Sequence, residues 1–121
     1  MSKVFLDTNL FIDLIYRRET DEFEYLNDHE LFISLLSYHI FFYTQRLKVP
    51  NAKVNKGLSR FNFVDLGKKV LKNSLEGPTI DLEDNIQLHS AAEAECDYFL
   101  TLDKKLLSMK FFGKTRIADQ I

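Results

Sequence analysis

The chain has 121 residues, of which 45% are hydrophobic. This length and composition are sufficient to enclose one core, but the chain is too short for two domains. Cys96 is the only cysteine, which excludes an intramolecular disulfide and a thiolate zinc site and fits a reducing compartment. No apolar run approaches the roughly 18 residues of a membrane span, and no signal-peptide pattern opens the chain, so we expect a soluble cytoplasmic protein.

The net charge of −2 is unevenly distributed. Residues 1–30 carry eight acidic and three basic side chains, whereas residues 41–72 carry eight basic and one acidic. A basic segment in an otherwise acidic chain can bind a polyanion by displacing counterions, although a solvated lysine-rich loop has the same composition. The candidate polyanion contacts are Arg46, Lys48, Lys53, Lys56 and Arg60.

The first predicted strand, residues 3–6, runs directly into Asp7. An amphipathic helix is predicted over 9–17, with Thr8 or Asn9 as its cap. Asp7 therefore lies at the carboxyl end of a buried strand, where ligands bind in an open parallel sheet. A buried carboxylate is costly unless a cation meets it, but capping of the following helix is an equally simple role for Asp7.

The remaining predicted elements alternate between helices and strands. The first five are an acidic helix over 20–28, a strand over 30–34, an aromatic helix over about 36–47, a basic loop over 51–59 and a strand over 61–66. They are followed by a basic helix over about 67–75, a helix capped by Asp81, a strand over 98–102, a short helix near 106–109 and a strand near 115–117. Strands separated by helices imply right-handed crossovers and a parallel sheet that is covered on both faces.

Several acidic residues are predicted to meet at one edge of this sheet. Asp7 and Asp103 each follow a predicted strand, and one predicted helix begins with Asp81, Glu83 and Asp84. Crowded carboxylates repel one another and raise each other's pKa values unless a cation neutralises them. Oxygen ligands without cysteine favour Mg²⁺ or Mn²⁺, and such an ion can activate water to attack a phosphodiester.

Four short motifs lie in a particular order along the chain. They are Val-Phe-Leu-Asp-Thr-Asn at 4–9, Ile-Ser-Leu-Leu-Ser at 33–37, Asp-Leu-Glu-Asp at 81–84 leading into Gln87 and Ala91-Ala92, and Leu-Thr-Leu-Asp at 100–103. Together they resemble the PIN-domain nucleases, and the small VapC-like toxins of toxin-antitoxin systems are nearest in pattern. The resemblance extends from Val4 to about Ile117, and the order and spacing of the motifs make it specific.

This resemblance implies a single PIN-like domain over residues 1–121, an α/β fold with a three-layer α/β/α sandwich around a parallel sheet of about five strands. It implies a metal-dependent endoribonuclease that uses Mg²⁺ or Mn²⁺, acts as a homodimer and is held silent by a cognate antitoxin. Asp7, Asp84 and Asp103 match the catalytic, metal-binding acids of the family. Thr8 or Asn9 would orient Asp7, and Thr101 would line the site.

The sequence departs from the family at one position. The usual second acid, a glutamate on the helix after the Ile-Ser strand, aligns with His39 or its neighbourhood, and residues 34–47 contain no acid. A neutral His39 could ligate a divalent ion, although Mg²⁺ prefers oxygen, and otherwise it would be a core or interface histidine. Glu83 or Asp81 could compensate from the opposite wall, although Asp81 also fits a purely structural cap.

Two other interpretations of the function are compatible with the sequence. In the first, the chain is a PIN-like binding module that has lost catalysis and uses its basic segment to hold RNA or a partner. In the second, Asp7 is the phosphoryl-accepting nucleophile of a phosphatase. That class matches the first strand only loosely, because Asn9 stands where its second aspartate belongs.

Overall fold

β1 (Lys3–Leu6) lies inside the sheet, because it pairs in parallel with β2 (Glu30–Ser34) on one side and with β4 (Tyr98–Leu100) on the other. The structure is a computed structural model and describes residues 1–17 and 20–121. The part of the chain that it describes forms a six-stranded sheet in the order β3-β2-β1-β4-β6-β5. The other strands are β3 (Phe61–Val64), β5 (Phe111–Phe112) and β6 (Thr115–Ala118). Five strands are mutually parallel, as predicted, and β5 is antiparallel to β6.

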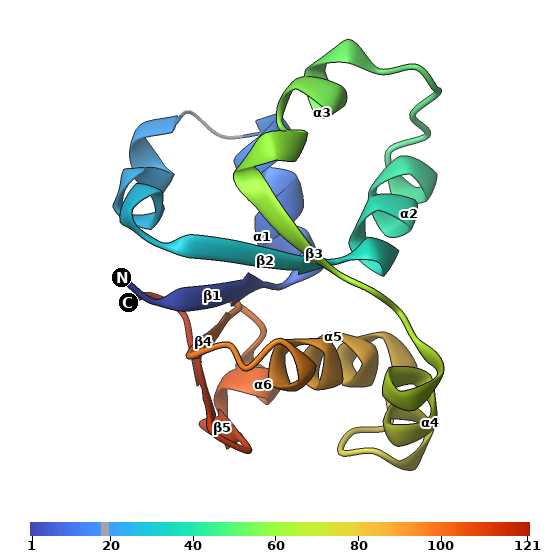
Figure 1. The fold of residues 1–121 in the computed structure, drawn as a ribbon, viewed down its shortest axis with the longest axis vertical. Helices are drawn as coiled ribbons and strands as arrows, with labels where there is room; N and C mark the ends of the chain where they lie inside the picture. The colour runs from blue at the N-terminus through green and yellow to red at the C-terminus, as the bar shows by residue number, and fades with distance from the viewer. Residues whose placement is uncertain (18–19) are drawn as a thin grey trace.

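Helices cover both faces of the sheet. The α-helices are α1 (Thr8–Ile12), α2 (Leu35–Thr44), α3 (Ala52–Lys56), α4 (Lys68–Glu76), α5 (Leu82–Glu93) and α6 (Lys104–Leu107). A π-helical segment, η1 (Asp13–Arg17), continues α1, and η2 (Thr20–Asp28) and η3 (Leu58–Arg60) are 3-10 helices. Figure 1 shows α1, α2 and α3 on one side of β1 and β2, and α4, α5 and α6 on the other. The predicted three-layer α/β/α architecture is thus confirmed.

Residues of β1 alternate between two hydrophobic cores. Val4 and Leu6 pack in the first core with α1 and α2, whereas Phe5 packs in the second core with α5. Phe5 is fully buried, and its ring stacks on Phe99 of β4 with 5.4 Å between the ring centres. Because both faces of β1 are buried, its carboxyl end is held firmly between the two helical layers, and Asp7 is the next residue.

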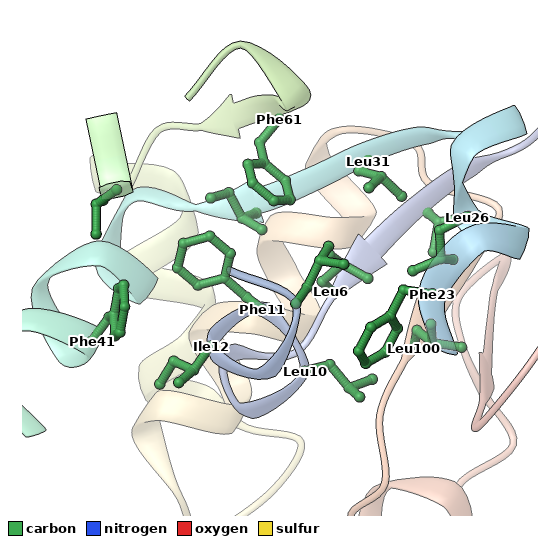
Figure 2. Close-up of a cluster of buried hydrophobic side chains, with 14 residues drawn as sticks. Leu6, Leu10, Phe11, Ile12, Phe23, Leu26, Leu31, Phe41, Phe61 and Leu100 are labelled. Atoms are coloured by element: carbon green, nitrogen blue, oxygen red, sulfur yellow. The ribbon is translucent and has the colours of Figure 1, made fainter. Parts of the chain in front are cut away.

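Phe11 anchors α1 in the first core. Figure 2 shows its ring pointing into the cluster beside Leu6 and Phe61. The ring makes edge-to-face contacts with Tyr38, Phe41 and Phe61, with centre-to-centre distances of 4.9, 5.9 and 5.3 Å. Such pairs add to the stabilisation from burial. This packing fixes α1, and therefore Asp7 at its amino terminus, against the sheet.

The first helix differs from its prediction in its cap and its geometry. It begins at Thr8, and its cap is not Thr8 or Asn9 but Asp7, in the alternative role that the sequence allows for that residue; the Asp7 Oδ1 atom accepts a hydrogen bond from the Thr8 N–H. The α-helical turns change to π-helix at Asp13, and residues 20–28 form a 3-10 helix rather than an α-helix. Apolar spacing does not distinguish these helix types, since each places neighbours three to five residues apart.

The carboxyl-terminal region contains a strand that was not predicted. Phe111 and Phe112 form β5, which turns into β6 through Gly113 at a φ of 61°. Glycine tolerates this left-handed conformation because it has no Cβ. A two-residue strand is too short to show alternation, so periodicity could not reveal it. Among the described residues, no helix combines the length and the apolar character that crossing a membrane requires.

Candidate functional site

Asp7 is a nearly buried carboxylate at the carboxyl end of β1, with 8% of its surface exposed. Its Oδ1 atom accepts a hydrogen bond from the Thr8 N–H at 2.7 Å, and its Oδ2 atom accepts one from the Thr101 hydroxyl at 2.6 Å. Thr101 follows β4, which pairs with β1 so that Leu6 faces Leu100. The parallel pairing of two neighbouring strands therefore brings Thr101 to Asp7, where it lines the site.

The environment of Asp7 opposes its ionisation. Burial raises its pKa, and the nearby charge of Asp103 raises it further. Hydrogen bonds from Thr101, Thr8 and Gln87 lower the pKa, but they do not outweigh the loss of solvation. A charged Asp7 is consequently costly in this position, and a cation beside it would reduce that cost.

Asp103 lies in the same neighbourhood and also starts a helix. Its Oδ1 atom accepts hydrogen bonds from the N–H groups of Lys105 at 2.8 Å and Leu106 at 3.4 Å, which caps α6. Its own N–H donates to the Thr101 hydroxyl at 3.0 Å. The Thr101 hydroxyl thus forms hydrogen bonds with both Asp7 and Asp103. Asp103 therefore caps α6 and also lies beside Asp7.

A hollow of about 310 Å³ opens between Asp7 and Asp103. Its lining residues are Asp7, Asn9, Leu10, Asp13, Leu102 and Asp103. The structure therefore brings Asn9 to the site together with the two predicted aspartates. Asp13 was not predicted as a site residue, yet it lines the same hollow. Asn9 and Asp13 are four residues apart, and side chains at that spacing share one face of a helix, which is a signal that could have found Asp13.

The start of α5 supplies further carboxylates. Asp81 is a structural cap, because its Oδ1 atom accepts a hydrogen bond from the Asp84 N–H at 3.0 Å. Burial raises the pKa of Asp84 to about 6, and repulsion from Asp81, Asp7, Asp103 and Glu83 contributes to the rise. Burial also raises the pKa of Glu83, with smaller effects from Asp81 and Asp7. Acids from three separate segments therefore influence one another electrostatically.

Asn85 fixes the position of this helix start. It is 3% exposed, and its Nδ2 atom donates to the carbonyl oxygens of Ser74 at 2.8 Å and Thr79 at 3.0 Å. Its Oδ1 atom accepts from the Thr79 N–H at 2.9 Å and the Thr79 hydroxyl at 2.7 Å. All the polar atoms of this buried amide are thus satisfied, and they join the end of α4 to the first turn of α5.

The raised pKa of Asp84 leads to a pH-dependent expectation. Its pKa is about 6 in the folded protein and 3.8 for an unperturbed carboxyl group, so ionised Asp84 opposes folding above the folded pKa. The cost disappears as the pH falls toward the unperturbed value. We expect Asp84→Asn to be more stable than the parent at about pH 7 and to lose this advantage by about pH 4. Urea unfolding without divalent ions at the two pH values measures this difference.

Glu93→Gln is the matched control, because Glu93 lies at the other end of the same helix. Glu93 forms an exposed ion pair with Lys69 at 3.2 Å, so this substitution should change the free energy of unfolding by no more than about 1 kcal/mol. A stability difference between Asp84→Asn and the parent that is equal at both pH values would contradict an electrostatic cause.

The structure does not bring His39 to Asp7. His39 is exposed and stacks on Tyr43 with 6.3 Å between the ring centres. It lines a separate hollow of about 750 Å³ near the end of α2, together with Phe42, Tyr43, Thr44, Arg46, Leu47 and Lys48. The α2 residue that reaches the site is Ser37, whose hydroxyl lies 3.0 Å from that of Thr8. Ser37 and Thr8 are both buried.

The candidate polyanion-binding residues lie on the α2 and α3 side of the molecule. Arg46 and Lys48 line the hollow that contains His39, and Lys53 and Lys56 lie on α3, which Figure 1 places beyond α2. Arg60 donates from Nη2 to Asn27 Oδ1 at 2.7 Å, and the partial burial of its guanidinium lowers the pKa of that group. These side chains are exposed and belong to neighbouring elements.

The donor set at the site matches a hard divalent ion in its chemistry. Asp7, Asp84, Asp103 and Glu83 offer carboxylate oxygens, which are the ligands that Mg²⁺ and Mn²⁺ prefer. The repulsion that raises the pKa of Asp84 would be relieved by a cation among them. Within residues 1–17 and 20–121, no three histidine, cysteine, aspartate or glutamate side chains are arranged closely enough to hold an ion as they stand.

Comparisons with known proteins identify the fold. No protein-family model matches the sequence, and no curated protein matches it. A chain in the crystal structure of VapBC2 from Rickettsia felis, bound to a DNA fragment from their promoter, matches with a TM-score of 0.70 and 17% identity, over 96% of this chain and 97% of that one. A chain of a toxin-antitoxin complex from Klebsiella pneumoniae matches with a TM-score of 0.73 and 19% identity, over 98% and 99%. The chain therefore has the PIN-like fold that its motifs predicted, and it shares this fold with a chain of VapBC2 and with a chain of a toxin-antitoxin complex.

Proposed function

We propose that this protein is a metal-dependent endoribonuclease, the toxin of a toxin-antitoxin pair, and that it hydrolyses RNA phosphodiester bonds in the cytoplasm. The observation that carries the proposal is the placing of Asp7 and Asp103, which are 96 residues apart in the sequence, around one hollow and on one Thr101 hydroxyl; the pKa of Asp84, raised in part by the charges of Asp7 and Asp103, supports it. Asp7 and Asp103 also cap helices, but capping does not require carboxylates to be crowded together, whereas binding of a cation favours such crowding.

Asp7, Asp84 and Asp103 would hold the ion, with Glu83 beside them. The chemistry that a bound Mg²⁺ or Mn²⁺ supplies is the activation of water and the neutralisation of phosphate charge. The chain itself fixes the orientation of the carboxylates: Thr101 holds Asp7, and the first turn of α6 holds Asp103. The hollow that Asp7 and Asp103 line would be the route by which an RNA strand reaches them.

The proposed partners are RNA, a cognate antitoxin and a second copy of this chain. Arg46, Lys48, Lys53, Lys56 and Arg60 would contact RNA phosphates, since neighbouring exposed basic side chains attract a polyanion. An antitoxin is proposed because the two structurally similar chains come from complexes that contain one.

A second candidate function is supported by α2. This helix carries no acid, its His39 lies away from Asp7, and Ser37 is the residue that faces the site. A domain with fewer ligands could hold RNA or a protein without cleaving it. In that case RNA binding would weaken with salt, and a chelator would have no effect.

The test is incubation of the purified protein with mixed RNAs in Mg²⁺, in Mn²⁺ or in an excess of chelator. We expect internal cleavage with either ion and none in chelator, because the carboxylates alone supply no Lewis acid. Products are read on a denaturing gel, and filter binding in parallel reports RNA affinity. Retention of RNA without cleavage under all three conditions would favour the binding module, and cleavage that persists in chelator would contradict the metal-dependent mechanism.

A further inference from the structure

Gln87 is a fully buried polar side chain beside the carboxylates. It lies on α5 one turn after Glu83, and none of its surface is exposed. Burying an amide costs free energy unless its polar atoms are hydrogen-bonded, and an apolar residue at this position would avoid the cost. The contacts of Gln87 therefore indicate what it does.

The two ends of the Gln87 amide contact different parts of the site. The Oε1 atom accepts a hydrogen bond from the Thr8 N–H at 2.9 Å, and the same N–H donates to Asp7 Oδ1. The Nε2 atom points to Glu83 Oε2 at 3.5 Å, and the proximity of the amide lowers the pKa of Asp7 slightly, against the larger effect of burial. Gln87 thus lies between Asp7 and Glu83: it contacts Glu83 directly, and it shares the Thr8 N–H with Asp7.

Thr8 extends this connection to a third element. Its hydroxyl lies 3.0 Å from the Ser37 hydroxyl on α2, while its N–H is shared by Asp7 and Gln87. The first turns of α1 and α2 and the second turn of α5 are therefore joined through Thr8. All these groups except Glu83 are buried, so solvent competes little with the hydrogen bonds that join Asp7, Thr8 and Gln87.

We propose that Gln87 is a positioning residue: through the Thr8 N–H that it shares with Asp7, and through its contact with Glu83, its amide restrains two of the carboxylates that would bind the divalent cation. This inference rests on the proposed metal-dependent function. Outer residues that orient metal ligands through hydrogen bonds change metal affinity by about 10- to 100-fold when they are replaced. Gln87 would act in this way without contacting the ion or RNA.

The test compares Gln87→Met with the parent. Methionine has a similar length and volume but offers no N–H donor and only a weak acceptor. We expect the Kd for Mn²⁺, measured by titration with electron paramagnetic resonance, to rise about 10- to 100-fold. RNA cleavage should fall at low Mn²⁺ and recover at saturating Mn²⁺. The Mn²⁺ concentration that gives half-maximal cleavage should therefore rise, while kcat at saturating Mn²⁺ changes less. A residue that only filled space would not change the Kd.

Two further variants keep the test decisive. Gln87→Asn retains a buried amide but is one methylene shorter, so it should fold and still weaken Mn²⁺ binding. Ser90→Ala is the matched control, because Ser90 is a fully buried polar residue on the same helix and its hydroxyl has no hydrogen-bond partner within the described structure. It should leave the Kd unchanged. Thermal unfolding of every variant confirms that the proteins are folded.

The possible outcomes separate this inference from the proposed function. If the parent binds Mn²⁺ and cleaves RNA, and both folded Gln87 variants bind Mn²⁺ as tightly as the parent, the positioning role is wrong and the nuclease proposal stands. If the parent neither binds Mn²⁺ nor cleaves RNA, both proposals are wrong. A weaker affinity in Gln87→Met and Gln87→Asn, with no change in Ser90→Ala, supports the positioning role.

Discussion

Asp7→Asn is expected to abolish RNA cleavage, with a loss of at least about 100-fold, while the protein stays folded. The substitution removes the charge that would bind the cation but keeps the shape of the side chain. An asparagine oxygen can still accept from the Thr8 N–H, and the Thr101 hydroxyl can rotate to accept from the new amide. Cleavage in Mg²⁺ and in Mn²⁺, measured beside the melting temperature, checks both parts of this expectation.

The stability of Asp7→Asn has a predictable sign. Burial raises the folded pKa of Asp7 above its unperturbed value of 3.8, so the ionised carboxylate opposes folding at neutral pH. The amide carries no such cost, and the variant should melt at a temperature no lower than that of the parent. Loss of activity without loss of stability is typical of residues that are kept for function.

Asp97→Asn is the matched control for Asp7→Asn. Asp97 is exposed and lies beside the opposite end of β1, where its Oδ2 atom accepts from the Lys3 N–H at 2.8 Å. Cleavage by this variant should equal that of the parent. If Asp7→Asn itself cleaved RNA as fast as the parent in either ion, Asp7 would not be a metal ligand and the nuclease proposal would be rejected.

Phe11→Ala is expected to lower the free energy of unfolding by about 3–5 kcal/mol. Phe11 is fully buried and contacts three aromatic rings, so alanine would leave a cavity in the first core. A domain of this size has a total stability of about 5–15 kcal/mol, and the loss would therefore be a large share of it. Urea denaturation followed by circular dichroism measures the change.

Phe111→Ala provides the comparison for this core substitution. Phe111 is 57% exposed on β5, so its replacement should cost no more than about 1 kcal/mol. Equal losses for the two variants would mean that the first core does not collapse around Phe11 as the structure describes. The comparison matters for function as well, because the packing of Phe11 holds the helix that begins beside Asp7.

Much of the architecture could be derived from the order of residues alone. Apolar strands that alternate with amphipathic helices predict a parallel sheet with helices on both faces, because buried strands and helical stripes have different periods. Asp7 and Asp103 could be placed at one edge for the same reason, since each follows a predicted strand, although β4 itself ends at Leu100, three residues before Asp103. Those inferences depend only on local patterns and on the handedness of crossovers.

Other features depend on contacts between residues far apart in the sequence. His39 and Ser37 are two positions apart on one helix, and only the packing of α2 against α1 decides that Ser37 faces Thr8 while His39 lies against Tyr43. The role of Gln87 was hidden because its hydrogen-bond partner, Thr8, lies 79 residues away. Helix type was likewise undecided, because π and 3-10 segments share the apolar spacing of an α-helix.

The sequence by itself therefore determined the layers of the fold and the edge where the carboxylates gather, because periodicity and strand ends are local properties. The motif at 100–103 also implied, by its resemblance to the family, that Thr101 lines the site, but only the tertiary structure decided which atoms hold the carboxylates in place. The Thr101 hydroxyl donates to Asp7 and the Gln87 amide accepts from Thr8, through hydrogen bonds that span 94 and 79 residues, and no local pattern encodes a contact of that separation.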